Sequence, residues 1–331
     1  MNNSSEHGAN SAKVCVVIAA WNASATISRA VRSALAQAET AEVVVVDDAS
    51  TDNTADAART ADDGTGRLQV IRHEANQGPS AARNRAIAAS RAPFISILDA
   101  DDYLLPGRFQ PMLAQADWDV IADNIVFIRE TVADQFDSSL VPGFAAEAKL
   151  VSLHDFVLGN MARVGNNRGE LGFAKPLIRR DFFVRHGITY DENLRLGEDY
   201  AIYAQALAQG ARFLRIRTCG YVAIERDSSL SGSHRTADLA ALLAFDRRFA
   251  LTPGLDRSAL ALVNRHASQL EHKVHYREIL DLRQSHGRPR AIVEAMRHPV
   301  ELPRLVWAYL RDKLVQHGPA PQPDAERYLF A

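Results

Sequence analysis

Residues 14–98 alternate short apolar runs with segments of helical spacing, and this alternation restricts the fold more than any other feature of the chain. The segments between the runs predict helices, the last of which opens with Gly78 and Pro79. The runs themselves predict four strands: VCVVIAA (14–20), EVVVVDD (42–48), RLQVIRH (67–73) and PFISILD (93–99). Such alternation predicts an α/β fold with a mainly parallel sheet between helices and right-handed crossovers.

Three parts of the chain differ in pattern. Residues 1–12 are polar and predict a disordered tail. The alternation of strands and helices loosens beyond about residue 118, and after about residue 236 the pattern is wholly helical. We therefore expect an α/β domain over 13–235 and a helical C-terminal region over 236–331, a division that suits a chain of 331 residues.

Composition argues against several classes of protein. A formal net charge of −2 argues against a nucleic-acid partner, because binding to a polyanion requires an excess of basic residues. Cys15 and Cys219 each lie in an apolar run and predict buried thiols rather than a disulfide framework. The first residues lack the order of a signal peptide, and no stretch of about 18 apolar residues occurs, so we expect a cytoplasmic protein.

Acidic residues gather where the second and fourth predicted strands end. Asp47 and Asp48 close one strand, and Asp99, Asp101 and Asp102 follow the other. Ligands of open α/β sheets bind beyond the carboxyl ends of the strands, so we expect these acids to share one crevice. Carboxylate oxygens suit Mg²⁺ or Mn²⁺, which usually keep coordination positions for phosphate oxygens. The pattern predicts a site for a metal and a diphosphate, and the alternative is that each acid caps a helix or forms a turn.

Four segments, in order, resemble the family 2 glycosyltransferases, whose catalytic domain has the GT-A fold. They are VVIAAWNASATISRAVRSALAQ (16–37), VVVVDDASTDNT (43–54), NQGPSAARNRAIAASRAPFISILDADD (76–102) and YDENLRLGEDYAIYAQAL (190–207). The resemblance spans about residues 13–235 and is closest to bacterial enzymes that build exopolysaccharides, such as the succinoglycan glucosyltransferases. It implies an inverting, metal-dependent enzyme that moves one sugar per encounter, with UDP-glucose as preferred donor, onto a saccharide hydroxyl.

The resemblance also implies roles for residues that bind the donor. Asp48 would hydrogen-bond the nucleotide base, Ala19 would line the same pocket, and Arg83 would approach the diphosphate. Asp99 would face the ribose and the metal, while Asp101 would ligate Mn²⁺ or Mg²⁺ directly.

Catalysis is implied at Glu198 and Asp199, at the start of a predicted helix. Asp199 would be the general base that takes the proton of the acceptor hydroxyl, and Glu198 would hold the acceptor or the base in place. The alternative is that both acids only complement the helix dipole. His234 would supply a further metal ligand, and the alternative is a solvated loop residue.

The acceptor and the membrane are two further expected partners. Residues 130–175 should contact the acceptor, and Arg163 and Arg168 could meet the phosphates of a lipid diphosphate-linked saccharide or be solvated loop charges. In the segment 298–315, apolar residues fall on one helical face with basic residues nearby. That helix would dock on its own core or on a second subunit, or would lie on the cytoplasmic face of the inner membrane.

Other functions on an α/β scaffold fit the sequence less well. A nucleotidyltransferase should carry a glycine-rich phosphate loop after its first strand, whereas AAWNASA (19–25) has no glycine. A dehydrogenase would need Gly-X-Gly-X-X-Gly, and a phosphatase of the haloacid-dehalogenase type would have its Asp-X-Asp after the first strand. A nucleotide-sugar-binding protein without transferase activity remains an alternative.

Overall fold

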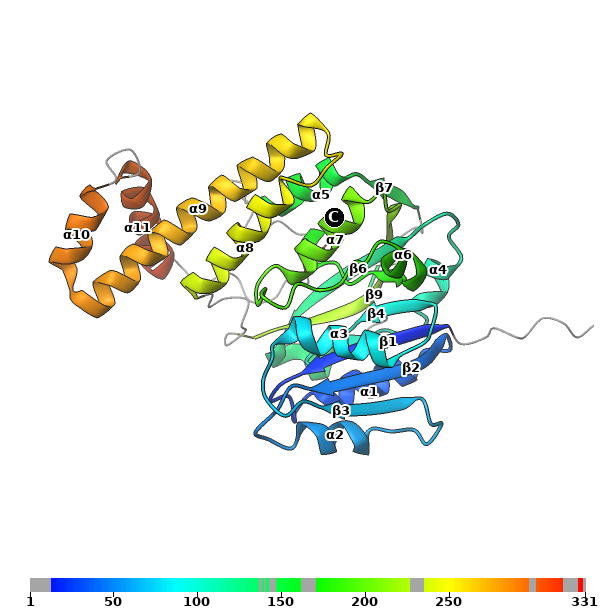
Figure 1. The fold of residues 1–331 in the computed structure, drawn as a ribbon. Coiled ribbons are helices and arrows are strands. Elements are labelled where there is room, and N and C mark those ends of the chain that lie inside the picture. The colour runs from blue at the N-terminus through cyan, green and yellow to red at the C-terminus, as the bar shows by residue number, and fades with distance from the viewer. Residues whose placement is uncertain are drawn as a thin grey trace, which may run out of the picture. The chain divides into compact units, whose positions relative to one another are not determined.

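The computed structural model describes residues 13–136, 139, 141–142, 147–161, 171–226, 235–297, 302–317 and 327–329. The chain divides into two compact units. One comprises Met1–Ser228 with Glu326–Ala331, and the other comprises Ser229–Ala325. Within the described residues, the first unit contains the sheet and the second consists of helices (Figure 1).

The parallel half of the sheet contains the four strands that the sequence predicts. Its strands are β1 (Val14–Ala20), β2 (Thr40–Asp47), β3 (Leu68–Arg72) and β4 (Phe94–Ile97). β1 pairs in parallel with β2 and β4, and β2 pairs in parallel with β3. Val43–Val46 are buried, as expected for strands covered on both faces.

The predicted helices between these strands are also present. They are α1 (Ile27–Leu35), α2 (Thr54–Thr60) and α3 (Pro79–Ala89). α1 and α2 contact each other, whereas α3 packs on β1 and β2. Pro79 at the first position of α3 has the backbone angle that a helix start requires and lacks an N–H that would otherwise be unpaired.

Beyond β4 the sheet becomes mixed. The order of strands is β3-β2-β1-β4-β8-β6-β9-β5. The strands added here are β5 (Tyr103–Leu104), β6 (Val120–Arg129), β7 (Lys149–Val151), β8 (Leu177–Arg179), β9 (Phe213–Glu225) and β10 (Arg327–Tyr328). β8 is antiparallel to β4 and β6, while β6 and β9 are parallel. β10 pairs with β6 and belongs to the first unit, although it lies in a region for which the sequence pattern predicts helices.

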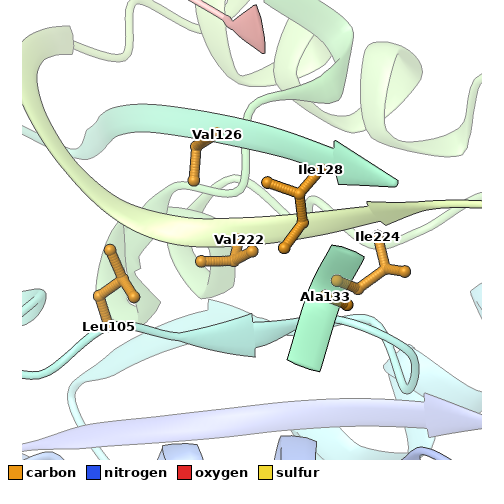
Figure 2. Close-up of a cluster of buried hydrophobic side chains, with 6 residues drawn as sticks. All are labelled: Leu105, Val126, Ile128, Ala133, Val222 and Ile224. Atoms are coloured by element: carbon orange, nitrogen blue, oxygen red, sulfur yellow. The ribbon is translucent and has the colours of Figure 1, made fainter. Parts of the chain in front are cut away.

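A cluster of buried apolar side chains, drawn in Figure 2, joins the long strands β6 and β9 to the segment that follows residues 99–102, here called the acidic loop. Its members are Leu105, Val126, Ile128, Ala133 of the 3₁₀-helix η1 (Glu130–Gln135), Val222 and Ile224. Full burial of each large aliphatic side chain is worth about 1.5–3 kcal/mol. The N–H of Leu105 donates to the carbonyl of Gly220 at 2.9 Å, so the cluster fixes β9 beside the acidic loop.

Further helices complete the two units. The first unit adds α4 (Phe109–Leu113), α5 (Leu153–Asn160), η3 (Leu171–Phe173), α6 (Arg180–Arg185) and α7 (Glu198–Ala208). The second consists of α8 (Thr236–Phe249), α9 (Arg257–His286), α10 (Arg288–Met296) and α11 (Leu302–His317), with α9 packed on α8 and α10. In the described part of the chain, none of the helices combines the length and the apolar character that crossing a bilayer requires.

Candidate active site

Asp48 directly follows β2, at the carboxyl end of the parallel strands. Its carboxylate accepts the N–H groups of Gln77 and Gly78 at 2.9 and 2.7 Å, and it lies 2.8 Å from Nδ1 of His73. Gly78 has a φ of 93°, a backbone conformation that only glycine adopts readily. Asp48 therefore holds the loop that leads into α3 at the end of β2.

The three acids after β4 have different environments. Asp102 is 6 % exposed, and its carboxylate accepts the hydroxyl of Tyr221 at 2.7 Å and the N–H of Ile224 at 2.8 Å. Burial, together with the charges of Asp101 and Asp99, raises the pKa of Asp102 well above its usual value. Asp102 thus fastens the acidic loop to β9, whereas the side chain of Asp101 is 41 % exposed.

Glu198 and Asp199 begin α7, which confirms the helix start that the sequence predicts. Gly197 precedes them in the left-handed region, with a φ of 72°. Asp199 is 7 % exposed, and its Oδ1 accepts the hydroxyl of Tyr190 at 3.2 Å. The N-terminus of a helix is a favourable place for a carboxylate because of the helix dipole.

Arg83 connects the two groups of acids. It lies on α3, is 4 % exposed, and places Nη2 2.9 Å from Oδ1 of Asp99. Its Nη1 is 2.8 Å from Oε1 of Glu198 and 3.6 Å from Oδ1 of Asp199. The structure therefore brings together residues that the sequence predicts separately for the donor and for catalysis.

Lys175 is a site residue that the sequence analysis missed. Its Nζ lies 2.8 Å from Oδ2 of Asp99 and 2.8 Å from Oδ2 of Asp199. Burial alone would lower the pKa of Lys175, but the charges of Asp199 and Asp99 outweigh burial and raise it above 10.5. The signal in the sequence was a lone lysine within the otherwise apolar segment GFAKPLI (172–178). A lysine in such a segment is expected to be buried, and a buried ammonium requires acidic partners.

Asp99 and Asp101 carry opposite pKa shifts. Burial would raise the pKa of Asp99, but Lys175 and Arg83 outweigh it and hold that pKa below the usual value. Partial burial and the charge of Asp99 raise the pKa of Asp101. Nη1 of Arg226 lies 3.5 Å from Oδ2 of Asp101.

The acidic loop suits a divalent cation through Asp101. Its carboxylate is accessible and sits next to the negative charge of Asp99, and hard oxygen donors are what Mn²⁺ and Mg²⁺ prefer. Both oxygens of Asp99, by contrast, already contact the protein cations Arg83 and Lys175. Within the described residues, no three His, Cys, Asp or Glu side chains gather as a ready metal centre.

The remaining predicted residues fall into two groups. Ala19 is partly exposed on β1 and pairs with Val46 of β2, one position before the carboxyl ends of both strands. His234, Arg163 and Arg168 lie outside the described residues.

Comparison with known proteins places the chain among sugar transferases. The model of the family "Glycosyl transferase family 2" matches residues 15–183. The succinoglycan biosynthesis protein ExoU of Rhizobium meliloti is 50 % identical over 310 residues, which cover 94 % of this chain and 90 % of the relative. ExoO of the same organism is 34 % identical, and the match covers 76 % of this chain and 72 % of ExoO. The Escherichia coli glucosyltransferase WfaP, named as UDP-Glc:alpha-D-GlcNAc-diphosphoundecaprenol beta-1,3-glucosyltransferase, is 37 % identical over 27 % of this chain and 36 % of its own length.

Solved structures share the fold at lower identity. TarS of S. aureus (residues 1–349) in complex with UDP-GlcNAc has a TM-score of 0.58 and 21 % identity, over 82 % of this chain and 74 % of that one. The mannosyltransferase PcManGT of Pyrobaculum calidifontis, in complex with GDP-Man and Mn²⁺, has a TM-score of 0.53 and 16 % identity, over 92 % of this chain and 85 % of that one. These likenesses confirm the GT-A architecture that the sequence motifs predict. Given the family match and the extent of identity with ExoU, the chain is a glycosyltransferase and belongs to glycosyl transferase family 2.

Proposed function

We propose that this protein transfers a hexosyl group, with UDP-glucose as preferred donor, to a hydroxyl of a saccharide during assembly of a bacterial exopolysaccharide. The observation that carries the proposal is the buried carboxylate of Asp199, joined through Arg83 and Lys175 to Asp99 at the end of β4. This arrangement puts a buried carboxylate next to the acids that follow a parallel strand, where α/β proteins bind nucleotides.

Asp199 is the general base of the proposed reaction. The acceptor oxygen attacks the anomeric carbon from the face opposite the diphosphate, and its proton passes to the carboxylate of Asp199. The electron pair of the breaking carbon–oxygen bond leaves with the diphosphate, so the sugar inverts without a covalent enzyme intermediate. Arg83 fixes Glu198 beside the base and contributes positive charge where the leaving group becomes negative.

Asp101, with Asp99 beside it, would hold Mn²⁺ or Mg²⁺. A bound divalent cation would neutralise charge on the leaving diphosphate. Asp48 and Ala19 remain the proposed contacts of the nucleotide base, and His234 remains a proposed further ligand of the cation. A nucleotide-sugar complex with Mn²⁺ in a protein of the same fold supports this metal.

The names of the relatives support the donor, the acceptor and the process. ExoU and ExoO are named for succinoglycan biosynthesis, and WfaP for a transfer from UDP-Glc to a sugar on diphosphoundecaprenol. We accordingly propose a lipid diphosphate-linked saccharide as acceptor. A lipid-linked acceptor would place the enzyme at the cytoplasmic face of the inner membrane.

The experiment is a calorimetric screen of UDP-glucose, UDP-galactose, UDP-N-acetylglucosamine, GDP-mannose and dTDP-rhamnose, with Mn²⁺ or with EDTA. UDP-glucose should bind the wild type with Mn²⁺ and lose this binding in EDTA and in Asp101→Asn. Release of UDP from UDP-glucose, with water or octyl β-glucoside as acceptor, should fall about 100-fold or more in Asp199→Asn but not in Asp181→Asn, an exposed control on α6. Failure of every donor to bind would refute the proposal.

The second unit exposes apolar side chains that suit a membrane surface. On α10 these are Ile292, Val293 and Met296, exposed by 54–64 %, and on α11 they are Val306, Trp307 and Leu310, exposed by 49–66 %. Leu305, in contrast, is buried, so only part of the predicted apolar face of α11 is covered. Exposed arginines flank these residues: Arg288, Arg290, Arg297 and Arg304. Apolar and cationic side chains together match an anionic lipid surface better than an apolar subunit interface.

Vesicle binding tests this part of the proposal. The protein should sediment with vesicles that contain phosphatidylglycerol and not with pure phosphatidylcholine vesicles, and Trp307→Ser with Met296→Ser should weaken the binding. Val184→Ser is the matched control, because Val184 is exposed in the first unit. A stable dimer that dissociates in the double variant, without any vesicle binding, would instead identify the surface as a subunit interface.

A further inference from the structure

Lys175 lies between Asp99, the acid proposed to face the donor, and Asp199, the proposed base. Its single ammonium lies 2.8 Å from Asp99, at the end of β4, and 2.8 Å from Asp199, at the start of α7. The residue is 8 % exposed. Its contact with Asp199 is shielded from solvent, whereas the side chain of Asp99 is 32 % exposed. An ammonium has three N–H groups and can therefore donate to both carboxylates at once.

The backbone of Lys175 is held by the buried side chain of Arg108. Nη2 of Arg108 donates to the carbonyl oxygen of Lys175, and the same Nη2 lies 2.8 Å from Oδ1 of Asp123. Arg108 and Asp123 are 2 % and 1 % exposed. The lysine thus projects from a segment that a buried ion pair holds in place.

The carboxylate of Asp199 is held on both of its oxygens. Lys175 donates to Oδ2, while the hydroxyl of Tyr190 donates to Oδ1 at 3.2 Å. Two donors on different oxygens fix the plane of a carboxylate, which would otherwise rotate about its last side-chain bond. A base must face the hydroxyl it deprotonates, and a misplacement of about 1 Å can cost about 100-fold in rate.

We infer that Lys175 is a positioning residue, which sets the orientation of the base Asp199 relative to the donor-side acid Asp99. This inference rests on the proposed function, because it assigns to Asp199 the proton transfer. Lys175 takes no proton from the acceptor and acts through the carboxylate that it holds. A purely structural lysine would instead only neutralise the two acids.

A double-mutant cycle separates the two roles. Lys175→Met, Asp199→Asn and the double variant are compared with the wild type, with Lys149→Met as control because Lys149 is exposed on β7. The rate of UDP release from UDP-glucose should fall about 100-fold in Lys175→Met, while calorimetric binding of UDP-glucose with Mn²⁺ changes less than about threefold. The double variant should be no slower than Asp199→Asn, since a lysine that acts through Asp199 has no effect once the base is gone.

Losses that multiply in the double variant, or an unchanged rate in Lys175→Met, would overturn the inference. If Lys175→Met does not fold, the same cycle with Lys175→Arg decides, because that variant keeps the charge but moves the donor atoms. A crystal structure of the folded variant gives a readout without activity: the carboxylate of Asp199 should rotate, and an unmoved carboxylate contradicts the inference. A wild type that binds no donor and releases no UDP would refute the proposed function itself. The crystallographic test does not depend on donor binding or activity, so the two failures can be told apart.

Discussion

Arg83 of α3 and Glu198 of α7 form an ion pair of 2.8 Å, although 115 residues separate them in the chain. The other terminal nitrogen of the same guanidinium contacts Asp99 at 2.9 Å. A planar guanidinium offers N–H groups in fixed directions, so one side chain can bind two carboxylates simultaneously. This contact holds the start of α7 against the end of β4.

Replacement of Arg83 by lysine should impair transfer even though the charge is kept. The single nitrogen of a lysine cannot reach Asp99 and Glu198 together, so one acid would lose its partner. We expect the kcat/KM for UDP-glucose to fall about 100-fold, the loss typical of one removed donor in an active site. Arg85→Lys, an exposed change on the same helix, should leave it within about twofold. Equal activities of the two variants in the UDP-release assay would contradict this role of Arg83.

Tyr190→Phe removes one hydroxyl that donates to Asp199 and leaves the ring in place. The ring also lies under Arg83, with the guanidinium carbon 5.3 Å from its centre, so its packing should persist. Loss of one hydrogen bond to a charged group is worth about 1.5 kcal/mol, which predicts a kcat about tenfold lower. The KM for UDP-glucose should not change. A raised KM with an unchanged kcat would mean that Tyr190 serves donor binding instead.

The parallel half of the fold was predictable because its strands are buried on both faces. Continuous apolar runs such as Val43–Val46 reflect that environment directly. The mixed half was not predictable to the same extent. β5, β8 and β10 contain two or three residues each, too few for a periodic pattern, and their positions depend on pairing with β4, β6 and β9.

Within the candidate site, the acids were easier to predict than their partners. Asp48 and Asp99 follow apolar strands, and Asp199 lies in the first turn of a helix, so their places in the sequence indicate where they lie. Lys175 and Tyr190 become site residues only through contacts across the fold, which no local pattern encodes. The sequence motifs therefore indicate the carboxylates, whereas the structure is needed to identify Lys175 and Tyr190, which orient them.

Asp52 joins the start of α2 to the loop after β1, and its contribution to stability should depend on pH. Its carboxylate accepts the N–H groups of Thr54 and Ser24 at 3.0 and 3.1 Å. Partial burial alone would raise the pKa of Asp52, but hydrogen bonds from Thr54 and Ser24 outweigh burial and lower it to about 2. Asp52→Asn should therefore reduce the free energy of unfolding by about 1 kcal/mol near neutral pH.

The sign of this pH dependence follows from the lowered pKa. The charged carboxyl stabilises the folded state fully above its ordinary value of 3.8, and this stabilisation is lost as the pH falls toward about 2. The difference in urea midpoint between the wild type and Asp52→Asn should shrink over that range. Glu74→Gln, at an exposed acid, serves as control. A difference that stays constant with pH would show that the hydrogen bonds do not depend on the charge of Asp52.

Substitution in the buried ion pair of Arg108 and Asp123 should strongly lower the free energy of unfolding. Its side chains are 0 % and 1 % exposed, and the guanidinium lies 2.8 Å from the carboxylate. Arg108→Met leaves a buried carboxylate without its partner, which should cost about 3–5 kcal/mol of unfolding free energy. The double variant Arg108→Met with Asp123→Leu removes both charges and should recover most of this loss in urea unfolding. The stem of Arg108 also packs closely against Gly220. A double variant as unstable as Arg108→Met would mean that this packing, rather than charge, sets the stability here. Because Arg108 also anchors the carbonyl of Lys175, the recovered protein should still release UDP more slowly than the wild type.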